Sequence, residues 1–226
     1  TSGQKKYYVV NNVLETFTSK VGQFVEIMNL EEFGNALFID HEIQVAEKDE
    51  KIYSSTFFKS SYNLSIKNDN VAIIGGGDGG VARECLDNST NYIDWYELDP
   101  EIVESCYRHL PKVCSKVKKS NNVNTFWGDA FESIKLVEDS KYDKIFVDLN
   151  DDQYCIDLAR KNMKGLKRIL KPGGVITAQV GSKDKKPKQV ENWCKVLEKS
   201  FGNVNISGVH VPSFDCNWNF ASSIMK

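Results

Sequence analysis

Short apolar runs rich in Val, Ile and Phe, separated by polar residues, mark the beginning of the chain as β-structure. Asp40 and His41 stand between the last two runs, and both residue types tolerate the positive φ angles of a two-residue hairpin turn. We therefore expect a small N-terminal β domain over residues 1–46 that ends in a hairpin. Its predicted strands cover residues 7–14, 23–30, 36–39 and 42–45.

The stretch over residues 47–62 changes to a pattern that predicts a helix. Charged residues come first, and Tyr53, Phe57 and Phe58 then fall on one side of the helix. We expect this helix and a following linker to form a bridge over residues 47–69.

From residue 70 onward, apolar strands alternate with helical segments, which predicts a parallel sheet with helices on both faces. The last two strands lie too close in sequence for a long helix between them, so we expect them to form an antiparallel pair. This ending is typical of the methyltransferase type of Rossmann-like sheet. The predicted fold is therefore α/β, with a Rossmann-like domain over residues 70–226. Its predicted strands cover residues 71–74, 92–96, 123–126, 144–147, 174–179, 204–211 and 218–224.

The first strand of this domain leads into a glycine-rich loop. Gly75, Gly77 and Gly80 fit G-x-G-x-x-G, a turn that brings the backbone close to a nucleotide ligand. Glu97 follows at about the 20-residue distance from which an acid reaches a ribose hydroxyl, so we expect an adenosine-like ligand. Asp78, inside the loop, would repel a pyrophosphate, so the group bound beside it should be cationic.

Acidic residues follow the first four strands of this region, where the ligand crevice of an open α/β sheet lies. Each has a plainer alternative: Asp99 precedes Pro100 as a helix N-cap, and the acids at 151 and 152 could be loop charges or caps. Together they would repel one another unless cations occupied the crevice, so we expect a polycationic ligand. The acids are Asp78, Glu97, Asp99, Asp129, Asp148, Asp151 and Asp152.

The amino-acid composition limits the classes of binding partner that we expect. The chain has 226 residues with 29 basic and 31 acidic side chains, and its net charge of −2 does not favour nucleic acid or a membrane surface. The sequence shows neither an apolar run of about 20 residues nor a signal peptide, so we expect a cytoplasmic protein that binds small molecules. The chain begins with Thr-Ser-Gly, which leaves open a further N-terminal region. The cysteines and histidines are scattered, so neither a metal site nor a disulfide framework is expected.

Several segments together resemble the aminopropyltransferases, the family of spermidine and spermine synthases. They extend over nearly the whole chain, and their combination is far more specific than a glycine motif alone. They are residues 33–40, 46–53, 75–84, 96–99, 128–131, 142–148 and 177–179.

The resemblance implies transfer of an aminopropyl group from decarboxylated S-adenosylmethionine to a polyamine, with release of 5′-methylthioadenosine. It implies decarboxylated S-adenosylmethionine as donor, no prosthetic group, and a homodimer or larger assembly. The acceptor is left open between putrescine, spermidine and another polyamine.

The resemblance also implies roles for single residues. On the donor side, the glycine loop would approach the nucleoside, Glu97 would hold the ribose hydroxyls, and Asp78 would meet the amine of the aminopropyl arm. On the acceptor side, Asp148 would be the catalytic acid/base with Tyr53 beside it. The remaining donor-side residues are Gln23, Gly75, Gly77, Asp129 and Ala130, and the remaining acceptor-side residues are Asp151 and Gln179.

The chain departs from the spermidine synthase pattern on the acceptor side. Asp148 is followed by Leu-Asn-Asp-Asp, closer to spermine synthases, and Ser54-Ser55 replace the usual Gln-Glu. Gly22 and Phe214 each stand at a position where the family has a tyrosine. Phe214 keeps the aromatic ring but lacks the hydroxyl. Asp215 could supply a replacement acid or simply end a loop.

Two other functions share these features. An S-adenosylmethionine methyltransferase would show the same fold and Glu97, but its substrate carboxylate would lie near Asp78. A non-catalytic homologue that binds nucleoside or polyamine, or regulates an active partner chain, would explain the altered acceptor side. The retained Asp78 and Asp148 count against it.

Overall fold

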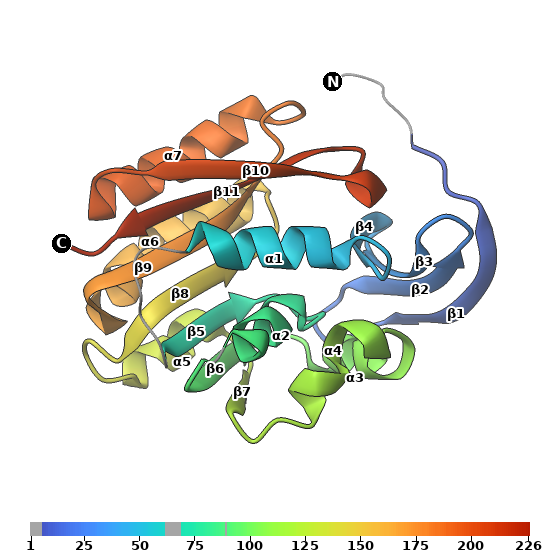
Figure 1. Cartoon of the computed structure of the whole chain (residues 1–226), viewed down its shortest axis with the longest axis horizontal. Coiled ribbons are helices and arrows are strands. Elements are labelled where there is room, and N and C mark those ends of the chain that lie inside the picture. The colour runs from blue at the N-terminus through green and yellow to red at the C-terminus, as the bar shows by residue number, and fades with distance from the viewer. Residues whose placement is uncertain (1–5, 62–68, 89) are drawn as a thin grey trace.

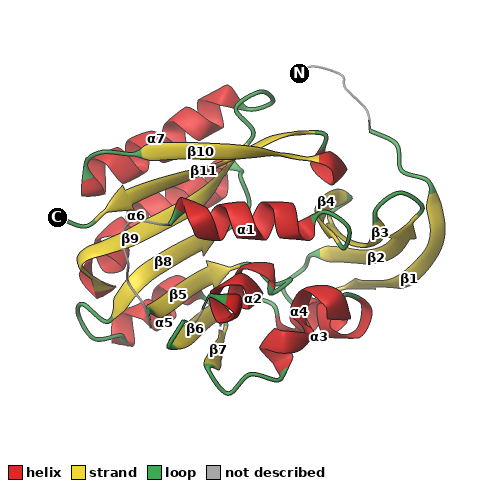
Figure 2. Cartoon of the chain, viewed as in Figure 1, coloured by secondary structure: helices red, strands yellow, loops and turns green. Residues whose placement is uncertain are grey.

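Two β-sheets, the larger one covered by helices on both faces, make up the fold (Figures 1 and 2). The computed structural model describes residues 6–61, 69–88 and 90–226. The predicted end of the bridging helix, Tyr62, and most of the linker that follows lie outside these residues.

The smaller sheet is antiparallel, with its strands in chain order. Asp40 and His41 form the predicted hairpin turn with φ angles of 50° and 66°. The predicted first strand is present, but its predicted limits of 7–14 were wrong, because pairing with the second strand, rather than local apolar character, sets them. The strands are β1 (Val10–Thr18), β2 (Phe24–Leu30), β3 (Gly34–Ile39) and β4 (Glu42–Ala46).

The larger sheet has the order β10-β11-β9-β8-β5-β6-β7 in the described part of the chain. Its first five strands along the chain are parallel, and β10 and β11 are antiparallel, which confirms the predicted fold class. The strands are β5 (Asn70–Gly75), β6 (Tyr92–Glu97), β7 (Val123–Trp127), β8 (Tyr142–Asp148), β9 (Leu170–Gly181), β10 (Asn205–Val211) and β11 (Cys216–Ile224).

Helices cover both faces of the larger sheet through two separate apolar clusters (Figure 1). One face is covered by α1 (Glu50–Ser60), α2 (Gly80–Asp87), α3 (Pro100–His109) and α4 (Pro111–Lys118). The other face is covered by α5 (Ala130–Ser133), α6 (Gln153–Ile169) and α7 (Pro187–Phe201). Short 3-10 helices, η1 (Ile134–Leu136) and η2 (Pro212–Phe214), complete the elements.

Helix starts follow the capping rules only in part. Asp99 caps α3 by accepting a hydrogen bond from the Glu101 amide, as its position before Pro100 predicts. The bridging helix α1 starts at Glu50, three residues later than predicted. Residues 47–49 form a turn instead, because the amides of Glu47 and Lys48 donate to the carbonyls of Asn35 and Phe33 at the edge of the small sheet.

The two sheets share apolar packing. Ile27 and Leu37 of the small sheet lie in one buried cluster with Ile102 and Leu110, which belong to the α3–α4 region. The predicted division into residues 1–46, 47–69 and 70–226 therefore stays a prediction about folding units.

The described residues contain no helix that is long and apolar enough to cross a membrane. They also contain no cluster of three His, Cys, Asp or Glu side chains with the geometry of a metal site. The six cysteines are free, and Cys85, Cys106, Cys114 and Cys216 are buried.

Candidate functional site

The glycine loop lies against the carboxyl end of β8. Gly75 pairs in register with Asp148, and the Gly76 amide donates to the Asp148 carbonyl at 3.1 Å. Gly75 has a φ of +81°, and a Cβ there would lie 2.4 Å from the same carbonyl oxygen. Only glycine fits this approach. The loop thereby brings the ends of β5 and β8 together.

Carboxylates flank the loop on both sides. A Cβ on Gly76 would lie 2.9 Å from Asp148 Oδ2, and one on Gly77 would lie 3.3 Å from Glu97 Oε2. Asp78 lies in the same loop, and its Oδ1 accepts a hydrogen bond from the Gly80 amide at 2.7 Å. The sequence-predicted acids of three strand ends are therefore gathered around one loop.

Burial raises the pKa values of these three acids. The pKa of Asp78 rises to about 8 through burial and then through the charges of Asp148 and Glu50. Burial raises the pKa of Glu97 to about 7. Burial also raises the pKa of Asp148 to about 6, against a hydrogen bond from Tyr53 that lowers it. A cation among them would favour their ionised forms.

Tyr53 contacts the candidate catalytic acid directly. Its hydroxyl donates to Asp148 Oδ1 at 2.7 Å. Burial, with the adjacent Asp148 charge, raises the pKa of Tyr53 well above its ordinary value, so Tyr53 remains a donor. Its ring is fixed by edge or tilted contacts with Phe57, Phe214, Trp218 and Phe220.

The other predicted acceptor-side residues have protein partners. The Gln179 amide oxygen accepts from the Gly181 amide and from Trp218 Nε1, both at 3.1 Å, and its nitrogen donates to the Leu149 carbonyl. Asp151 forms an ion pair of 3.2 Å with Lys186. Asp215 is exposed in a left-handed turn with φ of 52°.

The predicted donor-side residues lie at the ends of elements. Gln23 is half-buried just before β2, and Asp129 is an exposed N-cap that accepts from the Phe131 amide at 2.8 Å. Ala130 begins α5. Within the described residues, no side-chain hydrogen bond or ion pair links Gln23 or Asp129 to the Tyr53–Asp148 pair. Their roles stay predictions.

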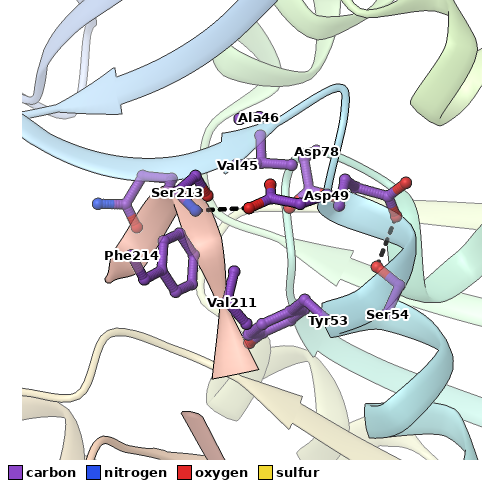
Figure 3. A pocket seen from close by; sticks show the side chains of 11 residues that line it. Val45, Ala46, Asp49, Tyr53, Ser54, Asp78, Val211, Ser213 and Phe214 are labelled. Atoms are coloured by element: carbon purple, nitrogen blue, oxygen red, sulfur yellow. Dashed lines mark hydrogen bonds between the residues drawn. The ribbon is translucent and has the colours of Figure 1, made fainter. Parts of the chain in front are cut away.

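A pocket beside Asp78 contains acids that sequence reasoning missed (Figure 3). Asp49 and Glu50 look like ordinary charges at the start of a helix, yet both are buried. They precede Tyr53 and Ser54 by four residues each, a spacing that places them on the same face of α1 and could have revealed them. The pocket is lined by Gln44, Val45, Ala46, Asp49, Glu50, Tyr53, Ser54, Asp78, Val211, Ser213 and Phe214.

Known proteins share both this sequence and this fold. The profile of the spermine/spermidine synthase domain matches residues 50–226. A polyamine aminopropyltransferase of Korarchaeum cryptofilum (strain OPF8) is 30% identical over 216 residues, which cover 94% of this chain and 67% of that protein. One of Prochlorococcus marinus (strain NATL1A) is 32% identical over 210 residues, which cover 88% of this chain and 72% of that protein.

Solved structures agree in fold. A crystal structure described as spermidine synthase in complex with the transition state analogue AdoDATO has a TM-score of 0.89 at 19% identity, over 98% of this chain and 79% of that one. Spermidine synthase from Thermotoga maritima has a TM-score of 0.88 at 19% identity, over 98% and 78% of the two chains. At this identity the likeness shows the fold, whereas the sequence matches show the family. The chain belongs to the spermine/spermidine synthase family of aminopropyltransferase enzymes.

Proposed function

We propose that the chain transfers an aminopropyl group from decarboxylated S-adenosylmethionine to a polyamine and releases 5′-methylthioadenosine. The observation that carries this proposal is the Tyr53–Asp148 hydrogen bond of 2.7 Å beside the half-buried side chain of Asp78, whose pKa is raised. Relatives named polyamine aminopropyltransferases support it, as does the AdoDATO complex of a protein with the same fold.

On the donor side, the glycine loop would approach the nucleoside while Glu97 accepts hydrogen bonds from the ribose hydroxyls. The position of Glu97 Oε2 near Gly77 supports this assignment. Asp78 would meet the ammonium group of the aminopropyl arm. The remaining donor contacts that we propose come from Gln23, Gly75, Asp129 and Ala130.

The reaction is a displacement at a carbon that the sulfonium already activates. The neutral fraction of the acceptor amine uses its lone pair to form a bond to this carbon, the electron pair of the broken carbon–sulfur bond stays on sulfur as 5′-methylthioadenosine leaves, and the nitrogen, now positively charged, loses a proton. An alkylamine has a pKa of about 10.4, so transfer of a proton from the alkylammonium to Asp148 before attack is uphill, even with the pKa of Asp148 raised to about 6. Asp148 therefore orients the amine and accepts its proton as the carbon–nitrogen bond forms. Tyr53 holds the Asp148 carboxylate in position.

We assign the acceptor to the side of the site formed by Asp151 and the aromatic ring of Phe214. Gln179 would act by holding Trp218, because its amide groups already bond to the protein. Putrescine and spermidine are the acceptors we propose, with Asp215 as a further acid. A homodimer or larger assembly, testable by sedimentation equilibrium, and a cytoplasmic location also stay predictions.

A product assay tests the proposal. The protein would be incubated with decarboxylated or intact S-adenosylmethionine and either putrescine or spermidine. We expect 5′-methylthioadenosine from the decarboxylated donor only. Formation of S-adenosylhomocysteine from the intact donor would instead indicate a methyltransferase, and the absence of both products would favour a non-catalytic binding protein.

Replacement of the proposed acid/base gives a sharper test. Asp148→Asn keeps the shape of the side chain but cannot accept the proton, so we expect turnover to fall about 10²- to 10⁴-fold. Calorimetric affinity for 5′-methylthioadenosine should remain. Asp157→Asn is the matched control, because Asp157 lies on α6 with a side chain 43% exposed. Unchanged turnover in Asp148→Asn would contradict the assignment.

A further inference from the structure

The pocket in Figure 3 lies between the first turn of α1, η2 and the glycine loop. Asp49 and Glu50 come from the start of α1, Ser213 from η2, and Asp78 from the loop. Asp49 precedes Tyr53 by four residues, which corresponds to about 6 Å along a helix. Tyr53 also lines the pocket, so the pocket adjoins the Tyr53–Asp148 pair.

Two buried polar atoms of residues that line this pocket have no hydrogen-bond partner within the described residues. Asp49 Oδ2 accepts from the Ser213 amide at 2.6 Å, while Asp49 Oδ1 has no hydrogen bond within the described residues. The Ser213 hydroxyl also has none there. Asp49 is 4% exposed and Ser213 is 0% exposed. Buried polar atoms are costly without a partner, so both atoms indicate a site for a ligand.

Three acidic side chains, Asp49, Glu50 and Asp78, line the pocket. Glu50 is paired with Arg83 at 2.6 Å. Within the described ranges, neither Asp49 nor Asp78 has a cationic side chain within 4.0 Å. Lys6 lies near this end of the molecule, but its ammonium donates to the carbonyls of Pro212 and Ser213 instead. Lys6 and Arg83 act on Asp49 and Asp78 only at longer range, so a positive ligand would be the cation in direct contact with these carboxyl groups.

Space is tight around Glu50, Ser54 and Asp78, three of the residues that line the pocket. A Cβ on Gly80 would lie 2.5 Å from both Glu50 Oε1 and Ser54 Oγ, and 2.8 Å from Asp78 Oδ1. A compact group fits such a space better than a planar guanidinium. The ammonium of an alkylamine is compact, positively charged, and carries three hydrogen-bond donors and no acceptor.

We propose that Asp49 and Ser213, together with Asp78, form a subsite for a primary ammonium group of a substrate. The inference rests on the proposed function, and it adds Asp49 and Ser213 to the contacts assigned from sequence. The ammonium can come from the donor's aminopropyl arm or from the far end of the acceptor. Both have the same chemistry, and binding experiments separate them.

Isothermal titration calorimetry on the full chain tests the subsite with Asp49→Asn, which keeps an acceptor for the Ser213 amide but removes the charge. The ligands are decarboxylated S-adenosylmethionine, 5′-methylthioadenosine, which lacks the arm, and 1,4-diaminobutane. We expect Asp49→Asn to weaken at least one amine-bearing ligand about tenfold, and 5′-methylthioadenosine by less than about twofold. If only decarboxylated S-adenosylmethionine loses affinity, the bound ammonium is that of the donor's aminopropyl arm. If only 1,4-diaminobutane loses affinity, the bound ammonium belongs to the acceptor.

The proposal would be overturned if the affinity for all three ligands fell equally, or if the affinity for neither amine-bearing ligand changed. If Asp49→Asn does not fold, Ser213→Ala decides, because it removes only the unpartnered hydroxyl and keeps the amide that Asp49 holds. Unchanged amine binding in Ser213→Ala would then overturn it. Asp157→Asn should bind all three ligands like the wild type. Because calorimetry needs no turnover, the subsite can stand even if no 5′-methylthioadenosine is ever produced.

Discussion

At the scale of single residues, burial disfavours the ionised forms of three carboxyl groups. The pKa values of Asp148, Glu97 and Asp78 rise to about 6, 7 and 8 respectively. A carboxyl group with a raised pKa is a better proton acceptor, and it gains more from a bound cation, than an exposed one. The site is thus suited to hold amines and to receive a proton.

Tyr53 affects the pKa of Asp148 through one hydrogen bond. Tyr53→Phe removes that bond while keeping the aromatic ring. The bond lowers the pKa of Asp148, so its loss should raise that pKa above about 6. The acid limb of the kcat–pH profile should therefore move to higher pH. Tyr154→Phe, at an exposed tyrosine of α6, is the control and should leave the profile in place. A shift to lower pH, or none, would contradict this role.

Asp78 should also control how stability depends on pH. Its pKa rises from an ordinary 3.8 to about 8 in the folded state, so the folded chain binds more protons between these values. Stability contributed by this group is present below pH 4 and is lost as the pH rises through 8. Asp78→Asn removes this dependence and can still accept from the Gly80 amide.

Relative to the wild type, Asp78→Asn should therefore gain in Tm as the pH is raised from 5 to 9. Thermal unfolding followed by circular dichroism at both pH values measures this difference. Asp157→Asn provides the comparison for an acid outside the pocket. A Tm difference between Asp78→Asn and wild type that is the same at both pH values would refute the expectation.

At the scale of elements, glycines act in two different ways. Gly75 has a left-handed φ and contacts the backbone of β8. Gly165 lies inside α6, and among the described residues a Cβ there would approach Ile134, at 3.5 Å. The first glycine is required by geometry, and the second costs the helix conformational entropy without an evident packing need.

Two alanine substitutions should therefore have opposite effects. Gly75→Ala should lower the free energy of unfolding by about 1–3 kcal/mol or more, through backbone strain and the close Asp148 carbonyl. Gly165→Ala should raise it by about 0.5–1 kcal/mol. Urea denaturation of both variants measures this. The explanation fails if Gly165→Ala destabilises the chain as much as Gly75→Ala.

At the scale of the whole molecule, the small sheet is not packed independently. Ile27 and Leu37 share a buried cluster with α3 and α4, which cover the larger sheet. A substitution that destabilises the small sheet should therefore lower the stability of the whole chain.

Ile27→Ala should destabilise the protein by about 2–5 kcal/mol, because it opens a cavity in this shared cluster. Urea unfolding should remain a single transition, with circular dichroism and tryptophan fluorescence coincident. The tryptophans lie outside the small sheet, so fluorescence reports on the larger part. Separate transitions would show that residues 1–46 fold as their own unit.

Local patterns in the sequence by themselves determined most of the fold. Apolar periodicity located the seven strands of the larger sheet, turn residues located the hairpin, and strand ends located Asp78, Glu97 and Asp148. These features depend on neighbours within a few residues, which is why they could be predicted. The late start of α1 could not, because the amides of Glu47 and Lys48 bond to carbonyls of the small sheet more than ten residues away.

Only the tertiary structure decided which side chains meet. The Tyr53–Asp148 bond joins residues 95 positions apart, and the Asp49–Ser213 bond joins residues 164 apart. Packing likewise turned Gln179 toward Trp218 and buried Asp49 in a pocket, where the sequence suggested an ordinary helix start. Such contacts depend on how whole elements pack, so the sequence supplied the candidate groups, and the fold brought them together.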